Sequence, residues 1–177
     1  LNLPPYIIFQ DPSLEDMTLK YPINLDELAN IHGVGEGKAK KYGKEFIDLI
    51  SKYILENNIS RPDDFVVKTS GSNSALKLYI IQSIDRKLPF DDIISSKGIE
   101  MNDFINEMES IVYSGTKLDL SYCIDDILDE DQQIELKEYF MDSDNDNIEE
   151  AMQEFEGDYE DFELRIYRIK FLSEFAN

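Results

Sequence analysis

The sequence predicts an all-α protein made of two joined helical domains, and three observations support this. Apolar residues recur at three- and four-residue steps, which is the period of an amphipathic helix. Asn, Asp, Pro and Gly stand where the helices would begin and end. The chain becomes more acidic after about residue 60, where a segment rich in loop-forming residues lies. We therefore expect a first helical domain over residues 1–58, a linker over 59–73 and a second, acidic helical domain over 74–177.

Three helices are expected in the first domain. A short helix lies within residues 11–22, where Asp11 or Ser13 caps it and Pro22 ends it. Asn24 caps a second short helix. A long helix follows from about residue 36 to 56, because its apolar residues fall on one helical face.

The second domain is predicted to be helical throughout. The clearest apolar stripe belongs to the segment "EMNDFINEMESIVYSG", which Gly115 ends. The segment "FELRIYRIKF" partly alternates, so a strand is the alternative to a helix there. The expected helices span residues 74–87, 89–98, 100–115, 121–128, 131–141, 147–155 and 159–174.

The charge of the chain limits the kinds of partner it can bind. Among 177 residues, 38 are acidic and 17 basic, which gives a formal net charge of −21. Residues 1–60 carry nine acidic and six basic groups, whereas residues 61–177 carry 29 and 11. Such a charge repels polyanions unless basic groups are locally concentrated.

The same composition bears on the compartment. The single cysteine, Cys123, excludes an internal disulfide and fits a reducing cytoplasm. No apolar run approaches the roughly 18 residues of a membrane span, so no membrane contact is expected. Because the chain starts at Leu1 without methionine, we expect it to be a fragment of a longer protein.

Residues 32–43, "HGVGEGKAKKYG", hold four of the eight glycines and three lysines, a composition typical of phosphate-binding turns. A P-loop would require a glycine at His32 and a hydroxyl at Ala39. A dinucleotide fingerprint would require a preceding strand and a different glycine spacing, but the preceding segment is predicted to be helical. Both nucleotide-binding interpretations therefore fail.

The spacing instead fits a helix–hairpin–helix, in which Gly33-Val34-Gly35 follows an apolar helix end. The amides of its turn lie at a helix N-terminus, where the helix dipole favours an anion such as a DNA backbone phosphate. Base identity would not be read there. A purely structural hairpin, whose glycines serve only the turn, is the alternative, and the motif leaves both open. The DNA-binding hypothesis names Gly33, Val34, Gly35, Gly37, Lys38, Lys40, Lys41 and Lys44.

A set of residues in the first third of the chain occurs together in one known domain type. These residues are Pro4-Pro5-Tyr6-Ile7-Ile8-Phe9, Asp11, Leu14, Met17, Tyr21-Pro22, Leu28, Gly33-Val34-Gly35 and Tyr42-Gly43. With them the segment resembles the HRDC domain, the helicase-and-RNase-D C-terminal module, and most closely that of bacterial RecQ-type DNA helicases. The resemblance implies a small helical bundle that helps a helicase engage DNA. It also makes Tyr6 a candidate for stacking on an unpaired base; the alternative is a tyrosine buried in the core. An HRDC domain normally begins with one more helix, which is missing here.

Residues 72–177 resemble, more diffusely, the helix-turn-helix region that follows HRDC in many such helicases. A DNA-reading helix-turn-helix would place "EMNDFINEMESIV" in the major groove. This segment carries Glu100, Asp103, Glu107 and Glu109 but no lysine or arginine, which argues against phosphate contact. We therefore expect a packing or protein-docking role for it.

Metal binding and catalysis find little support. Asp142, Asp144 and Asp146 fit the first three ligand positions of an EF-hand, but Asn147 stands where glycine is needed and Gln153 where glutamate is needed. We expect a solvated acidic loop, with Asn147 capping the next helix. The single histidine, His32, and the single cysteine are far apart in sequence and do not suggest a catalytic pair.

The expected function is that of a non-catalytic C-terminal accessory region of a RecQ-like ATP-dependent DNA helicase, which assists weak, sequence-independent DNA engagement in repair and recombination. The fragment needs no cofactor, while ATP, magnesium and zinc sites would lie upstream in the parent chain. A cytoplasmic, nucleoid-associated location is expected. The alternative is a protein-interaction module whose acidic surface docks on the helicase motor or on a basic repair protein. A nuclease resembling RNase D is a third class, but its paired-carboxylate domain is absent.

Overall fold

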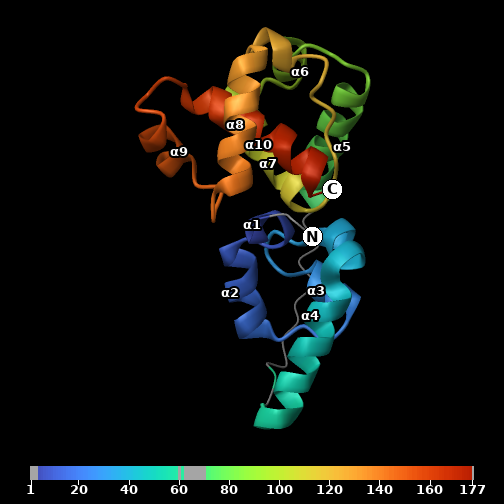
Figure 1. The fold of residues 1–177 in the computed structure, drawn as a ribbon. Helices are drawn as coiled ribbons and strands as arrows, with labels where there is room; N and C mark the ends of the chain where they lie inside the picture. Colours follow the sequence, from blue (N-terminus) through green and yellow to red (C-terminus); the bar gives the residue numbers. More distant parts are fainter. Residues whose placement is uncertain (1–3, 60, 62–70, 177) are drawn as a thin grey trace.

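The computed structural model describes residues 4–59, 61 and 71–176, and every regular element within them is a helix. The helices form two groups, with the N-terminal group below and the C-terminal group above in Figure 1. The all-α prediction is confirmed. Most of the expected linker, residues 59–73, lies outside the described residues.

The first domain begins with a short helix that the sequence did not predict. Asn24 caps α3 as expected, because its side-chain oxygen accepts a hydrogen bond from the Glu27 amide at 2.9 Å. The expected cap of α2 is wrong, since the helix begins after Gln10, which makes no side-chain cap. The helix ends as Tyr21 adopts a left-handed conformation before Pro22. The bounds are α1 (Pro5–Ile8), α2 (Asp11–Lys20), α3 (Leu25–Ala29) and α4 (Gly35–Asn57).

The second domain packs around its last helix. Its α-helices are α5 (Gly71–Asp85), α6 (Phe90–Lys97), α7 (Met101–Tyr113), α8 (Glu130–Asp142), α9 (Ile148–Glu154) and α10 (Asp161–Phe175). A 3-10 helix, Ile124–Asp126, stands where a longer helix was expected. The strand alternative for residues 162–171 is wrong. Helix α10 contacts α7, α8 and α9, so it is apolar on several sides and lacks a simple amphipathic stripe.

Two hydrophobic cores form, and they do not divide at the expected linker. The smaller core lies inside the first domain, around Phe9, Met17 and Leu28. The larger core fills the second domain, but it also takes Tyr6 and Ile7 from α1. Helix α1 therefore connects the two domains. Its Tyr6 and Ile7 belong to the larger core, whereas Phe9, which directly follows the helix, belongs to the smaller one.

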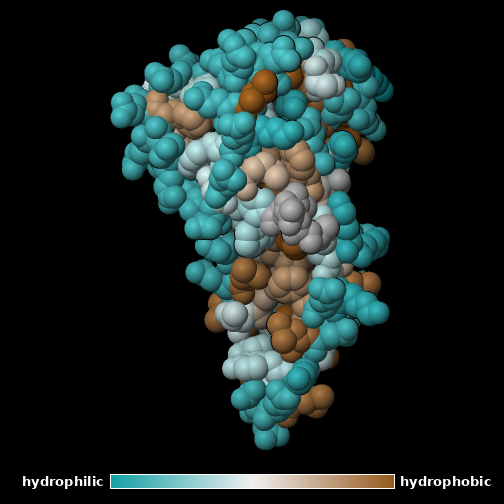
Figure 2. All heavy atoms as spheres, viewed as in Figure 1, coloured by the Kyte–Doolittle hydropathy of each residue, from teal (hydrophilic) through white to brown (hydrophobic). Residues whose placement is uncertain are grey.

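An apolar groove of about 420 Å³ runs between α2 and α4 in the first domain. Leu49 and Tyr53 in its wall are 65% and 52% exposed. Figure 2 shows hydrophobic side chains gathered on this domain, beneath a mostly hydrophilic second domain. No helix covers the groove in the described part of the chain, although the resemblance implies a further helix in an HRDC bundle.

Replacement of Gly43 by alanine tests how closely α3 and α4 pack. A β-carbon at Gly43 would lie 2.5 Å from Cδ2 of Leu28, whose side chain is fully buried. We expect Gly43→Ala to lower the free energy of unfolding by about 1–3 kcal/mol, although alanine favours a helix. Urea unfolding measures this. When Leu28→Val is also present, Gly43→Ala should lower the free energy of unfolding by less. If the effects of the two substitutions simply add, the close contact is contradicted.

Candidate functional site at the domain interface

The glycine-rich stretch forms the predicted hairpin. The turn between α3 and α4 closes through a hydrogen bond from the Val34 amide to the Ile31 carbonyl at 3.1 Å. Gly33 and Gly35 adopt φ angles of +72° and +60°, a region that glycine enters without a steric penalty. Helix α4 starts at Gly35, so its free N-terminal amides lie beside the turn, as the motif predicts.

The N-terminus of α4 meets the C-terminal end of α7 from the second domain. A β-carbon on Gly35 would lie 2.6 Å from the Ser114 carbonyl oxygen, and one on Gly37 would lie 2.6 Å from that of Gly115. Gly115 is equally constrained, since its own β-carbon would lie 2.6 Å from the Lys38 amide nitrogen. The positive end of one helix dipole thus faces the negative end of another, at a distance that glycine permits.

Lys38 lies inside this interface and not on the surface. Its side chain is 2% exposed, and its ammonium group donates to the Ile7 carbonyl at 3.0 Å. Burial lowers the pKa of Lys38 to about 8. The placement differs from the sequence hypothesis, which set Lys38 against a phosphate, because the side chain follows its apolar neighbours into the interface.

The other two lysines of the stretch and the lysine just after it lie on an exposed strip of α4. We call this strip the lysine ridge and define it as Lys40, Lys41 and Lys44. Lys41 donates to the Ala176 carbonyl at 3.1 Å, and Tyr42 donates to the same oxygen at 2.8 Å. The end of α10 therefore also docks on α4. Lys40 forms an ion pair with Glu36 at 2.8 Å. Because both side chains are exposed to solvent, this pair restrains the lysine only weakly.

Tyr6 is buried in the second core. Its side chain is 5% exposed, and its hydroxyl donates to the Phe140 carbonyl at 2.5 Å. Burial raises the pKa of this phenol above its ordinary value. In this arrangement the ring offers no face to a base. Of the residues that the sequence assigned to DNA, the structure leaves Gly37, Lys40, Lys41 and Lys44 exposed, and the DNA-binding assignment as a whole stays a prediction.

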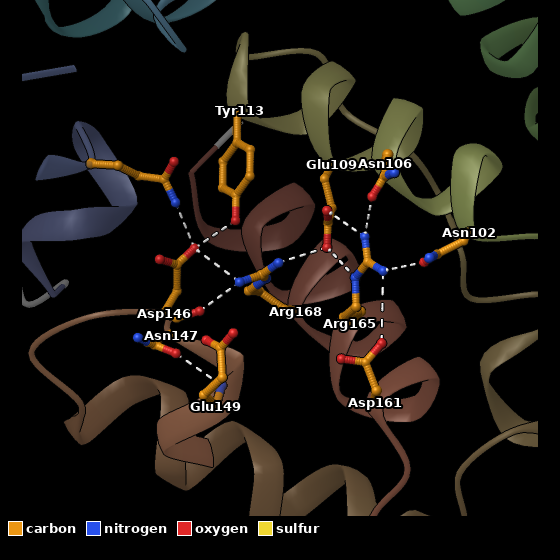
Figure 3. A network of polar contacts seen from close by, with 11 residues as sticks. Asn102, Asn106, Glu109, Tyr113, Asp146, Asn147, Glu149, Asp161, Arg165 and Arg168 are labelled. Carbon is orange, nitrogen blue, oxygen red and sulfur yellow. Dashed lines mark hydrogen bonds and ion pairs between the residues drawn. The ribbon is translucent and has the colours of Figure 1, made fainter. Parts of the chain in front are cut away.

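Asp146 links the two domains, although the sequence gave no sign of this role. Its carboxylate accepts hydrogen bonds from the Gln10 amide at 2.6 Å and from the Tyr113 hydroxyl at 2.7 Å (Figure 3). It sits in the acidic loop that was tested against an EF-hand. Asn147 caps α9 as predicted. Among the residues that the structure describes, no three acidic, histidine or cysteine side chains gather as metal ligands.

The polar face of α7 is occupied by two arginines of α10. Glu109 accepts from Arg165 at 2.8 and 2.9 Å and from Arg168 at 2.6 Å (Figure 3). Arg165 also donates to the side chains of Asn102 and Asn106 at 2.7 and 2.6 Å. The helix that the resemblance assigns to DNA reading therefore packs on α10 of its own domain, which fits the packing role among those expected. Asn102, Asp103 and Asn106 on this helix stay exposed.

A polar pocket of about 620 Å³ opens beside this network. Arg165 and Arg168 are among its lining residues and share Glu109, while Arg165 also pairs with Asp161 and Arg168 with Asp146. The remaining charged groups of its wall are carboxylates, so the pocket suits cations better than anions. They belong to Asp11, Asp146, Glu149, Glu150 and Asp161.

Cys123 and His32 do not form a catalytic pair within the described geometry. The thiol donates to the Leu120 carbonyl, and burial raises its pKa to about 11, so it is not an activated nucleophile. His32 lies in the hairpin of the other domain, and its backbone amide donates to Asp16. No helix in the described residues is long and apolar enough to span a bilayer.

Comparison with known protein families assigns a domain type to each half of the chain. Residues 1–50 match the family model of the HRDC domain. Residues 74–124 match that of the RecQ-1-like helix-turn-helix domain.

Two curated proteins show similarity to part of the chain, and both are named ATP-dependent DNA helicase RecQ. The protein of Bacillus subtilis (strain 168) is 47% identical over 52 residues, which is 29% of this chain and 9% of the relative. The protein of Haemophilus influenzae (strain ATCC 51907 / DSM 11121 / KW20 / Rd) is 40% identical over 58 residues, which is 32% of this chain and 9% of the relative. The matches thus span about a tenth of each relative's length.

Removal of Glu109 should destabilise the second domain. Glu109→Ala leaves Arg165 and Arg168, whose side chains are 12% and 11% exposed, without their shared carboxylate. We expect a loss of about 3–5 kcal/mol in the free energy of unfolding, measured by urea denaturation. Glu100→Ala, at an exposed position before the same helix, should have little effect.

Glu109 should also make the protein sensitive to acid. Burial alone would raise the pKa of Glu109, but its hydrogen bonds and attraction to the two arginines outweigh burial and lower it. Its stabilisation is therefore complete above the ordinary glutamate pKa and is lost as the pH falls through the lowered value. Thermal melts of Glu109→Gln should depend less on pH than those of the wild type below about pH 4.5.

Lys38 should make stability rise with pH in the alkaline range as well. Because its folded-state pKa is about 8, the folded protein releases this proton before the unfolded chain does. Stability should rise by roughly 1 kcal/mol per pH unit above that value, until the buried tyrosines begin to oppose it near pH 10. Urea unfolding between pH 7.5 and 9.5 tests this. Lys38→Met should flatten the rise, and an equal slope in both proteins would contradict the burial of a charged group.

Proposed function

We propose, from the premise that this chain is a C-terminal region of a RecQ-type helicase, that it serves as the accessory region of such an enzyme and helps it engage DNA during repair and recombination. The adjacent HRDC and RecQ-1-like helix-turn-helix domains support this proposal. The catalytic motor, with sites for ATP, magnesium and zinc, would lie in the upstream part of a longer parent chain. Strand separation would belong to that motor, and this region would position the substrate.

The observation that carries DNA engagement is the exposed lysine ridge beside the hairpin. Lys40 and Lys44 lie four residues apart, so their side chains project from the same side of α4. Backbone phosphates are the groups that such lysines attract, and they carry no sequence information. The contact would be weak because the net charge of −21 opposes every approach of DNA. The helix-turn-helix domain contributes no base contacts in this scheme, since α7 carries no lysine or arginine and its Asn102, Asn106 and Glu109 already bind Arg165.

The second candidate function is docking on a basic protein surface. The polar pocket beside Asp146 favours it, because exposed carboxylates surround its already neutralised arginines. A lysine- or arginine-rich surface on the motor or on a repair protein would match that charge. Titration with the motor domain tests this alternative, and absence of binding at low salt would count against it.

Charge reversal on the lysine ridge tests the DNA proposal. We expect Lys40→Glu with Lys44→Glu to weaken binding to labelled single-stranded and forked DNA, measured by fluorescence anisotropy across a salt series. The slope of log affinity against log salt should fall by about 1–2, which corresponds to two lost phosphate contacts.

The matched control is Lys52→Glu with Lys117→Glu, which makes the same change in net charge at exposed lysines outside the ridge. It should weaken binding less. Equal effects of the two double variants would show that only total charge matters, and unchanged binding in the ridge variant would refute the proposed contact.

A further inference from the structure

The second domain occupies the space beside the hairpin and one of its cationic donors. The Ser114 and Gly115 carbonyl oxygens lie against the first turn of α4, 2.6 Å from the positions of β-carbons on Gly35 and Gly37. The Ala176 carbonyl accepts from both Lys41 and Tyr42. These oxygens come from the C-terminal ends of α7 and α10, so they carry the partial negative charge of two helix dipoles. The side of the hairpin that faces the second domain is therefore closed to a phosphate, and Lys41 already has an oxygen partner.

The second domain covers the other predicted contact as well. Tyr6 lies in the larger core with its hydroxyl on the Phe140 carbonyl, and Lys38 is buried against the Ile7 carbonyl of the same helix. Gln10 and Asp146 add a polar tie at the edge of this interface. Only Lys40 and Lys44, of the cationic residues assigned to DNA, face solvent without a contact to the second domain.

We infer that the second domain is a removable cover, and that its docking and the binding of a phosphate at the hairpin exclude each other. A phosphate oxygen and the Ala176 carbonyl oxygen would need the same Lys41 donor, and a phosphate at the first turn of α4 would need the space of Ser114 and Gly115. The inference rests on the proposed function, because it concerns regulation of the same DNA contact. In the closed form DNA reaches only Lys40 and Lys44; in the open form it gains the α4 amides and the Lys41 ammonium group.

Once the domains separate, binding of a phosphate at the hairpin is favoured over the return of the carbonyl oxygens. A phosphate carries a full charge, so its hydrogen bonds to amides and to lysine are stronger than those of a neutral carbonyl. Departure of α1 with the second domain would also break the bond between Lys38 and the Ile7 carbonyl, which frees an additional ammonium group. Residues 61–177 carry most of the negative charge, and their movement away would reduce the repulsion of DNA at the hairpin.

Gly115→Ala in the full chain provides the test, because its β-carbon would meet the Lys38 amide and force the interface apart. Gly157→Ala is the matched control: both glycines have a φ of +89°, but nothing lies within 4 Å of a β-carbon at Gly157. If the closed form predominates about ten to one, opening should tighten binding to labelled single-stranded DNA about tenfold. The control should bind like the wild type. Small-angle scattering should show expansion of Gly115→Ala alone.

A milder variant guards against misfolding of Gly115→Ala. Gln10→Ala with Tyr42→Phe removes one interdomain hydrogen bond at each edge and keeps the Tyr42 ring. It should give a smaller gain in affinity in the same direction. Wild-type affinity in both variants would overturn the cover, even if the ridge charge reversal still weakened binding. A different result would separate the two proposals. If the wild type binds no DNA and Gly115→Ala does bind it, the ridge contact is refuted and the cover is supported.

Discussion

The arrangement of this protein depends on the direct contact between the start of α4 and the end of α7. Gly35, Gly37 and Gly115 bring the two helix ends together with no side chain between them. The contact places the first turn of α4 directly against carbonyl groups of the second domain. A β-carbon at any of these glycines would collide with backbone atoms of the other domain and strain the bonds across the interface, among them Gln10 to Asp146 and Lys41 to Ala176. The hairpin glycines therefore serve two purposes, because they make the turn and they admit a second domain.

The second structural constraint is the charge network on α10. Arg165 and Arg168 place two of the chain's few basic groups in the interior, where Glu109 holds both. This use of arginine orients α7 and α10, and it leaves the outer surface of the second domain more acidic than the composition alone requires. In this domain of the helix-turn-helix type, Asn102, Asn106 and Glu109 of the acidic helix α7 bind Arg165 of α10.

These features together describe an accessory region whose two domains form one interlocked body. Helix α1 contributes to both cores, so the boundary along the chain is not the boundary in space. If the region engages DNA, it does so against its own charge, and the geometry of the interface decides how many donors are available. The acidic surface makes docking on a basic partner compatible with the same architecture.

Local sequence by itself determined the helical class, most helix positions and the hairpin turn. Apolar periodicity located α4 and α7, and Asn24 and Asn147 marked helix starts, because capping depends on residues only two or three positions away. The family resemblance, carried by many residues together, located the two domain types. Only the tertiary structure decided which of the predicted DNA contacts are accessible. Tyr6 bonds to Phe140 and Lys41 to Ala176, at separations of 134 and 135 residues, and no local pattern encodes such pairings. Burial is a property of what packs against a residue, so the sequence identified the hairpin but not what fills it.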